Sequence, residues 1–521
     1  MPSGRPVEPG IWLLDLDIAG QTHRLATEAV EVTTAAGETI AYREGLAEPS
    51  VGMSAAADAG PASIALEITT DTDWALLVSQ GHSLDQRPAA LRRYYSGRTL
   101  ERGRVVLRGR TSQPSFGARY EPLRLSLTRD VASTAAVIPD PQAVVDASTW
   151  PVTGGATLPS SADGAYYPVV IGCPGHTGGM PVPCVPVPQA EFQAGLGVPK
   201  NVWLGGHASQ VRLRTLSAGV TTDSDVTPSV FGDLLGRDVD YVLNSASDTD
   251  VQAWVGFQDD ASYGGGLYFE GVLLRGAGDV VSWVLRTCDH TIDWARIEAT
   301  RAYLNNYKID TYINAPVNLW DWLQAEVLPM LPVELREGPA GLYLAVYRWD
   351  AREKDAVAHL DATLGSGRVT RDGSASYVGD PVNEITVDYR PGAESGARWL
   401  DRRVVTAQYG SVDIALTEDP RIVPHRIASE SRARYGPRPV RLQLSATWDT
   451  DTAVRVGLDT LLRAGLPKLA IRYVGGPWLE DLEVGAVVLV TDPELYLSAA
   501  VALVVEVTPG SDTAVDVLLL G

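Results

Sequence analysis

The chain has 521 residues, with 43 lysines and arginines against 64 aspartates and glutamates, so its formal net charge is −21. This length exceeds what one hydrophobic core supports, and the negative charge disfavours contact with nucleic acid or an anionic membrane. The three cysteines do not form a disulfide framework, and no apolar run has the length of a membrane helix or of a secretory signal. We therefore expect a reduced, multidomain protein that is made in the cytoplasm.

Residues 1–135 are predicted to form an N-terminal β-barrel-like domain. Strand composition with partial alternation occurs at 11–18, 29–35, 63–69, 104–109 and 123–130, and a short helix is expected at 73–80. An arginine-rich stretch follows the helix, and its members Arg92, Arg93, Arg98 and Arg102 are candidate subunit-interface residues. A basic surface on an acidic protein can contact an acidic neighbour, although a solvated hairpin face explains the same pattern.

Residues 136–275 are predicted to be a Pro/Gly-rich connector followed by a second β-rich domain. Strands are expected at 166–172, 201–206, 211–216, 251–257 and 267–274. Apolar loops in the connector supply three further candidate interface residues, Val182, Val185 and Val187.

Residues 276–350 are predicted to be a helical or mixed domain. Asp279, Asp293 and Asn318 are expected to be the N-caps of three helices, the last of which stops before Pro329. Residues 351–521 are predicted to form a C-terminal tube-like β domain with one helix and a closing hairpin. The expected fold class is mainly β with a smaller helical part, with tube-like barrels near both ends and an irregular β-rich and helical middle.

Two segments, one towards each end of the chain, share a sequence pattern. Residues 66–80 and 442–458 both pass from an alternating strand through an Asp-rich cap into a helix. The repetition suggests two related barrels.

The best metal candidates are Cys173, His176 and Cys184. A structural zinc site needs four thiolate or imidazole ligands, and a fourth would have to come from His207 or His290. A loop shaped by glycine and proline explains the same residues without a metal. We expect no cofactor.

The sequence also contains few candidate catalytic residues. Residues 288–290 (Cys-Asp-His) place a thiol beside an imidazole, but a helix junction explains them. The paired aspartates lack the continuation of a calcium loop; Asp71/Asp73 and Asp449/Asp451 are read as helix caps and the others as loop acids. Nucleotide-binding and hydrolase motifs are missing from the sequence, so we expect no enzyme, although a glycosidase needs only two carboxylates.

The tryptophans fall into two groups, those expected in cores and those that are candidates for a binding surface. Trp12, Trp254 and Trp283 are expected in cores. Trp203, Trp399 and Trp478 lie in more polar contexts and are the candidates for a binding role.

The stretch 429–492 reads as a polar arm, a strand, a capped helix, a second strand and a short β-unit. Its segments 431–436 (SRARYG), 448–453 (WDTDTA), 461–463 (LLR) and 482–485 (LEVG) resemble the tail-hub proteins of long-tailed phages and gene transfer agents. Residues 63–69 are similar to the first domain of such hubs. Where the family has an aspartate after the glycine, this chain has Ala486. The polar groups of this turn must therefore find other hydrogen-bond partners.

The resemblance implies a homotrimeric hub of a tail tip or baseplate, located in the virion. Two tube-like barrels per subunit would give a pseudo-sixfold ring that adapts the hexameric tail tube to a threefold tip and lines the DNA exit channel. The implied partners are a distal tail protein, a tape measure protein and tip or fibre proteins. Phage DNA would pass through without specific binding, and host contact would be indirect.

Two other readings remain open. The tryptophans and the β-rich composition also suit a carbohydrate-binding or glycan-degrading virion protein. A bacterial adhesin is disfavoured because the sequence shows no secretory signal.

Overall fold

The computed structural model describes most of the chain. Described are residues 10–49, 53–54, 63–69, 74–100, 103–116, 121–129, 135–146, 160, 162–176, 179–188, 199–203, 208–217, 220–226, 229–234, 237–243, 250–257, 267–338, 341–363, 369–391, 399–405, 423–508 and 513–520. The fold is mainly β with several sheets and a smaller helical part, so the predicted fold class is confirmed. None of the helices in these ranges is long and apolar enough to cross a bilayer.

The N-terminal β unit is a sheet that curls back on itself. It contains β1 (Ile11–Ile18), β2 (Gln21–Ala26), β3 (Val30–Thr33), β4 (Thr39–Glu44), β6 (Ser63–Ile68), α1 (Trp74–Ser79), β7 (Pro88–Tyr94), β8 (Arg104–Ser115) and β9 (Leu123–Arg129). The strand order is β3-β4-β2-β1-β7-β8-β9-β6. Just after β4, the amides of Gly45 and Leu46 donate to Ala26 O of β2, both at 3.0 Å, and Leu46 bridges Ile68 of β6. The hydrogen-bonded path therefore returns to β2 and closes.

The alternating sequence of β1 explains why it lies at the centre of this unit. Trp12, Leu14 and Leu16 face the barrel core, while Ile11 and Leu13 face a second small core beneath the β3–β4 hairpin. Both faces of the first half of β1 are thus covered. The predicted strands and the helix of this region are confirmed, whereas β2, β4 and β7, which are short or rich in charge, were not predicted.

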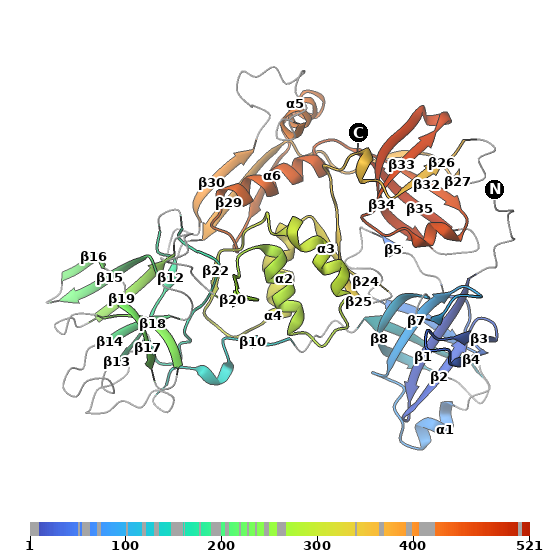
Figure 1. Ribbon diagram of the computed structural model, residues 1–521, viewed down its shortest axis with the longest axis horizontal. Coiled ribbons are helices and arrows are strands. Elements are labelled where there is room, and N and C mark those ends of the chain that lie inside the picture. Colours follow the sequence, from blue (N-terminus) through green and yellow to red (C-terminus); the bar gives the residue numbers. More distant parts are fainter. Residues whose placement is uncertain are drawn as a thin grey trace.

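An arm of two four-stranded sheets lies on the left in Figure 1. It contains β12 (Val182–Pro183), β13 (Val185–Pro188), β14 (Pro199–Trp203), β15 (Gln210–Ser217), β16 (Val220–Val226), β17 (Ser229–Leu234), β18 (Arg237–Leu243) and β19 (Asp250–Gly256). The sheet orders are β12-β19-β15-β16 and β13-β14-β18-β17. The segment 182–187, expected to be a loop, is therefore a pair of strands, because β12 and β13 bond to β19 and β14 respectively.

The helical core occupies the centre of the molecule (Figure 1). It contains β10 (Val137–Ile138), η2 (Pro141–Ala143), β11 (Val169–Ile171), β20 (Tyr268–Phe269), β21 (Val272–Leu273), α2 (Ala277–Arg286), α3 (Trp294–Leu304), β22 (Thr311–Ile313), β23 (Val317–Asn318), α4 (Leu319–Trp322), η3 (Leu323–Val327), η4 (Leu328–Met330), β24 (Val333–Gly338) and β25 (Gly341–Val346). Asp293 and Asn318 cap α3 and α4 as predicted.

Two boundaries in the helical core differ from the prediction. Asp279 is not an N-cap: α2 begins one turn earlier, after Gly276, and the Asp279 carboxylate instead binds the Arg301 side chain at 2.5 Å. The helix that begins with α4 continues through η3 and η4 to Met330. Pro329 stands early in the short η4 turn, where its missing N–H costs no helical bond.

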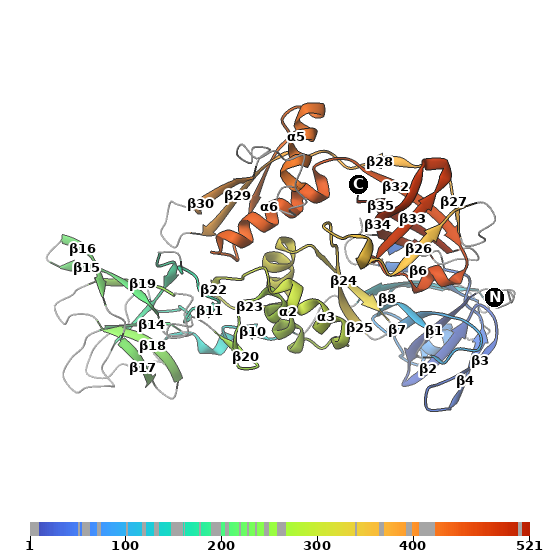
Figure 2. The ribbon, with the colours of Figure 1, turned by 45° about the horizontal axis from the view of Figure 1, so that its top comes forward.

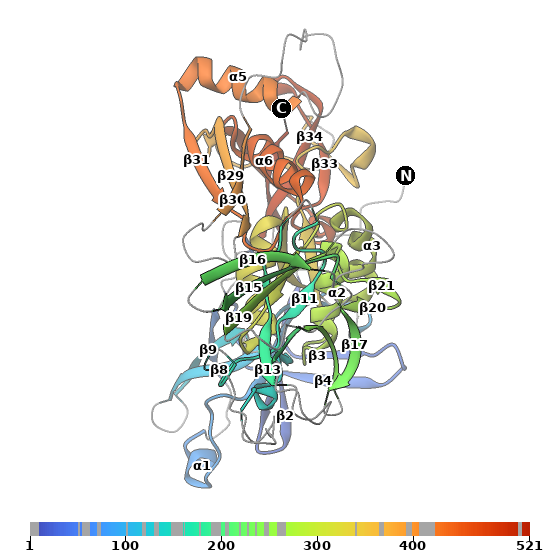
Figure 3. The same ribbon diagram turned by 90° about the vertical axis from the view of Figure 1, so that its left-hand side faces the viewer.

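The α/β layer and the C-terminal β unit complete the fold. The layer contains β29 (Glu384–Pro391), β30 (Trp399–Val405), α5 (Val423–Tyr435), β31 (Pro439–Gln443) and α6 (Thr450–Ala464). The C-terminal β unit contains η5 (Glu353–Asp355), β26 (Ala358–Asp361), β27 (Val369–Arg371), β28 (Ser376–Val378), β32 (Lys468–Gly475), η7 (Pro477–Asp481), β33 (Val487–Asp492), η8 (Pro493–Leu495), β34 (Leu497–Thr508) and β35 (Thr513–Leu519). Its sheet runs β26-β33-β34-β35-β32-β27, and the layer is inserted between β28 and β32. Figures 2 and 3 show α5 and α6 on one side of the layer's strands.

The stretch 429–492 differs from its prediction in one element. The expected polar arm is the last part of α5, which Asn383 holds in place: its side-chain amide donates to Ser431 Oγ at 3.1 Å and to Gly436 O at 2.9 Å. The helix capped by Asp449 is confirmed as α6. However, β31 and α6 belong to the layer and not to the C-terminal β unit. The pattern shared by residues 66–80 and 442–458 therefore does not relate two barrels.

Asp310 joins the helical core to its neighbours. Its carboxylate is fully buried and accepts from Arg275 Nε at 2.7 Å, from Arg275 Nη2 at 3.2 Å and from the backbone amide of Cys173 at 2.7 Å. Its own amide donates to Ala446 O of the layer at 2.9 Å. A Cβ at Gly172 would lie 2.6 Å from Asp310 Oδ1, and the φ of Gly172 is +72°. This position therefore requires glycine.

We predict that Asp310→Ala lowers the free energy of unfolding by about 3–5 kcal/mol, because it leaves the Arg275 guanidinium buried without its counter-ion. Chemical denaturation followed by circular dichroism measures the loss. Glu430→Ala is the control: it breaks an exposed pair with Arg434 on α5, which is worth roughly 0.5 kcal/mol. Equal losses in the two variants would contradict a central role for Asp310.

Candidate functional site

The two β units meet at the end of β7, where an arginine is buried. Arg93 is 1% exposed, and its guanidinium carbon lies 4.8 Å from the centroid of the Trp12 ring on the paired strand β1. A Cβ at Gly10 would lie 2.5 Å from Arg93 Nε and 2.9 Å from Tyr95 Cε1. Glycine at position 10 thus lets both side chains pack under the start of β1.

Residues of η7 and β35 approach the same place from the C-terminal β unit. Glu480 is 6% exposed and accepts from Thr513 Oγ1 at 3.1 Å. Burial, followed by the neighbouring Glu480 carboxylate, raises the pKa of Tyr95 above its usual value. The Tyr95 phenol therefore stays neutral and packs against a buried carboxylate that belongs to the other β unit.

Two further contacts fix the units relative to each other. Arg98 Nη1 lies 3.6 Å from Asp481 Oδ1, with both side chains partly exposed. The short strand β5 (Met53–Ser54), which lies in the chain between β4 and β6, pairs antiparallel with β34 at residues 506 and 507. Figures 1 and 2 both show the two units side by side. The junction therefore combines main-chain pairing, a buried polar group and a surface ion pair.

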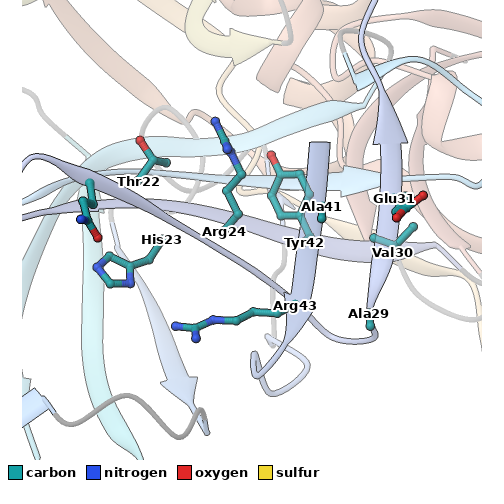
Figure 4. Close-up of a pocket in the computed structure, with 10 residues that line it drawn as sticks. Thr22, His23, Arg24, Ala29, Val30, Glu31, Ala41, Tyr42 and Arg43 are labelled. Atoms are coloured by element: carbon teal, nitrogen blue, oxygen red, sulfur yellow. The ribbon is translucent and has the colours of Figure 1, made fainter. Parts of the chain in front are cut away.

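An open cleft of about 710 Å³ lies on the N-terminal β unit where β2 and β4 diverge. These parallel strands pair only at residues 25–26 and 43–44, and the cleft opens beyond that point. Figure 4 shows His23, Arg24, Tyr42 and Arg43 around it. Burial and the Arg43 charge lower the pKa of His23, and Tyr42 donates to Asp15 Oδ1 at 2.8 Å. Two arginines, Arg24 and Arg43, thus line the cleft together with one carboxylate, Glu31.

The metal candidates Cys173 and Cys184 belong to one hydrophobic cluster, and His176 Nδ1 lies 3.1 Å from Cys173 O. Cys173 is fully buried, and His176 lies 3.7 Å from Asp310 Oδ2 and 3.8 Å from Asp449 Oδ1. Burial raises the pKa of the Cys184 thiol, which disfavours the thiolate that zinc requires. Among the described residues, no group of three His, Cys, Asp or Glu side chains could hold a metal ion. His176 instead stands between two carboxylates, one from the helical core and one from the cap of α6.

The thiol–imidazole pair has ordinary packing roles. Cys288 Sγ donates to Val284 O at 3.4 Å, and the His290 ring packs against Trp320 with the ring centroids 5.0 Å apart. The two side chains therefore make separate contacts at the end of α2.

The candidate interface residues fall into three groups. Arg92 and Arg98 keep partial exposure, and Arg92 Nε lies 3.5 Å from Asp15 Oδ2. Arg93, Val182 and Val185 are buried within the chain, the valines at the base of the arm. Arg102 and the side chain of Val187 lie outside the described residues, as do His207 and the side chains of Trp203 and Trp399.

One tryptophan differs from its prediction. Trp254, expected in a core, is half-buried on the outer face of the arm, with the Arg214 guanidinium carbon 5.2 Å from its ring centroid. The alternation of β19, in which Ala253 and Val255 are the buried positions, carries this signal in the sequence. Asp223 and Asp225, expected in a loop, lie on β16.

A cavity of about 220 Å³ separates α6 from the end of the helical core, and Asp459 lines it together with Trp349 and Arg463. The Asp459 carboxylate accepts a hydrogen bond from Tyr307, which is fully buried. Burial raises the pKa of Asp459 to about 6, although Arg455 and Arg463 oppose the shift.

The other ionisable groups around Asp459 affect its pKa or have their own pKa changed by it. Asp350 acts in the same direction as burial. Tyr303, which packs edge-on against Tyr307, has its pKa raised to about 12 by burial and by Asp459, while Arg348 opposes this. Asp459 is therefore the acid in this contact whose charge changes just below neutral pH.

We predict that Glu480→Ala loosens the junction. The change removes the acceptor of Thr513 and the carboxylate beside Tyr95, and a buried hydroxyl without a partner costs about 1–3 kcal/mol. Hydrogen exchange should become faster in β7 and β34. The control is Asp481→Ala, which removes only the exposed partner of Arg98. If both variants exchange like the wild type, Glu480 does not hold the units together.

We predict that Asp459 makes stability depend on pH between about 4 and 6. Its pKa is raised in the folded state, so the protonated form stabilises the fold and that contribution is lost as the pH rises through about 6. Relative to Asp459→Asn, the wild type should lose on the order of 2 kcal/mol between pH 4 and pH 7.5. Urea unfolding at several pH values measures this difference.

Asp451→Asn is the matched control, since Asp451 is exposed in the first turn of the same helix. A difference between wild type and Asp459→Asn that stays constant with pH would contradict the assignment.

No protein-family model and no curated protein matches the chain. Among solved structures, the chain is similar to a tail protein from Neisseria meningitidis MC58, with a TM-score of 0.37 and 11% identity over 97% of this chain and 96% of that one. It is also similar to a 43 kDa tail protein of prophage MuSo2 from Shewanella oneidensis, with a TM-score of 0.31 and 10% identity over 97% and 98% of the two chains. A third similar structure is a chain of the virion of a native gene transfer agent particle, with a TM-score of 0.33 and 12% identity over 70% and 88%. These TM-scores are low.

Proposed function

We propose that the chain is a structural hub of a phage-type tail tip or baseplate. The observation that carries this proposal is the junction of the two β units within one chain. A closed N-terminal β path and a curved C-terminal β unit are held side by side by β5–β34 pairing and by the buried group around Glu480. A subunit built in this way offers two β units to one ring. The resemblance of segments 431–436 and 482–485 to tail hubs supports the same function.

The proposed assembly is a homotrimeric ring. Three chains with two β units each would present six units to a sixfold tail tube and keep threefold symmetry towards the tip. Such a ring requires a head-to-tail contact that closes. Arg24 and Arg43 of the cleft, together with Arg92 and Arg98 on the same unit, are the proposed contact for an acidic surface of the next subunit.

The charge of the chain suits the proposed channel. A net charge of −21 disfavours adhesion of DNA to a lumen through which it must pass. The proposed neighbours are a distal tail protein, a tape measure protein and tip or fibre proteins, and contact with the host surface is indirect. The protein would be made in the host cytoplasm and act in the virion as a non-enzymatic part.

We predict that native mass spectrometry finds a species of three times the chain mass of 55.7 kDa, and that electron microscopy shows it as a threefold ring. The double variant Arg24→Glu, Arg43→Glu should shift the population to monomer by placing negative charge in the cleft. Arg434→Glu on α5 is the charge-matched control. If the wild type is a monomer at every concentration, the ring is contradicted. If the double variant is still a trimer, the contact between subunits does not lie at this cleft.

A further inference from the structure

The outer sheet of the arm has one apolar and one polar face. Val211, Leu213 and Val255 point inward and are buried in the core of the arm. The alternate positions point outward, and β15 carries Arg212 and Arg214 there. Because β15 lies between β16 and β19, these arginines stand in the middle of the outer face. Figures 1 and 2 show these strands at the free end of the arm, away from both β units.

Both arginines are held by fork-like pairs with the neighbouring strand. Arg214 donates through Nε and Nη2 to the two carboxylate oxygens of Asp223 at 2.8 and 2.9 Å. Arg212 donates to Asp225 in the same way at 2.9 and 3.4 Å. The Arg214 contact lowers the pKa of Asp223, which keeps that carboxylate charged. Bidentate pairing fixes the planes of these groups while the side chains remain 34–63% exposed.

Strand β19 adds an aromatic ring and an amide to the outer face. Trp254 lies opposite Arg212 in the register of β15 and β19, and Gln252 lies opposite Arg214. The Trp254 ring is half-buried and carries the Arg214 guanidinium against it. The outer face thus carries six side chains on three strands: one indole, two guanidinium groups, two carboxylates and one amide.

We propose that this outer face binds a glycan. A sugar ring has an apolar face of C–H groups that suits an indole, and hydroxyls at its rim that suit carboxylates, guanidinium groups and amides. The two arginines and two aspartates cancel in charge, which disfavours a nucleic acid or an anionic membrane as the ligand. The position at the free end of the arm leaves room for a polymer. The occupant is therefore a neutral polysaccharide, and the site adds a binding role to the proposed hub.

The test is a binding measurement on the 521-residue chain with three soluble neutral probes: dextran, mannan and galactan. The wild type should bind at least one of them in isothermal titration. Trp254→Ala should weaken that binding by roughly tenfold or more. Tyr377→Ala is the control, because Tyr377 is an exposed aromatic residue on β28 of the C-terminal β unit, and the binding of this variant should equal that of the wild type.

Arg212→Ala provides a second variant that leaves the core of the arm intact, and it should weaken binding in the same direction. Circular dichroism verifies that each variant is folded. Wild-type binding to none of the three probes overturns the proposal, as does binding by both Trp254→Ala and Arg212→Ala that matches the wild type. The trimer measurement reports on the ring alone, so failure of the glycan site and failure of the hub are distinguishable.

Discussion

The buried carboxylate of Asp310 is the constraint on which the centre of the molecule depends. A charge removed from water must be matched by donors that are fixed in place. Here the donors come from Arg275, before α2, and from the amide of Cys173 at the root of the arm, while the amide of Asp310 reaches the layer. Three parts of the fold must therefore meet at one point. The arm, the helical core and the layer have defined positions because this carboxylate allows few alternatives.

The two β units are joined by a different kind of contact. Their junction is partly main-chain pairing, which depends little on side-chain identity, and partly a buried polar group of Tyr95, Glu480 and Thr513, which depends on it strongly. The first feature supplies attachment and the second supplies orientation. The proposed ring would need both, because small errors in orientation accumulate around a closed ring.

Features that depend on nearby residues were predictable from the sequence. The alternation of β1, the Asp293 and Asp449 caps and the β34–β35 hairpin follow from local patterns. The final turns of α5 were missed because this polar helix is held by the distant Asn383. The junction could not be predicted either, since nothing in the neighbourhood of Tyr95 points to a glutamate near the end of the chain. Trp254 was misassigned, although the alternation of β19 placed it on the outer face.

The pairing of β5 with β34 also has a consequence for biosynthesis. The ribosome makes β5 long before β34, and β26–β28 must wait for β32–β35 before their sheet is complete. Contacts between such distant segments form slowly and leave strand edges open in the meantime. The N-terminal β unit closes through its own strands and can fold during translation, whereas the C-terminal β unit cannot. The sheet of the C-terminal β unit is therefore complete only when β34 and β35 have joined it.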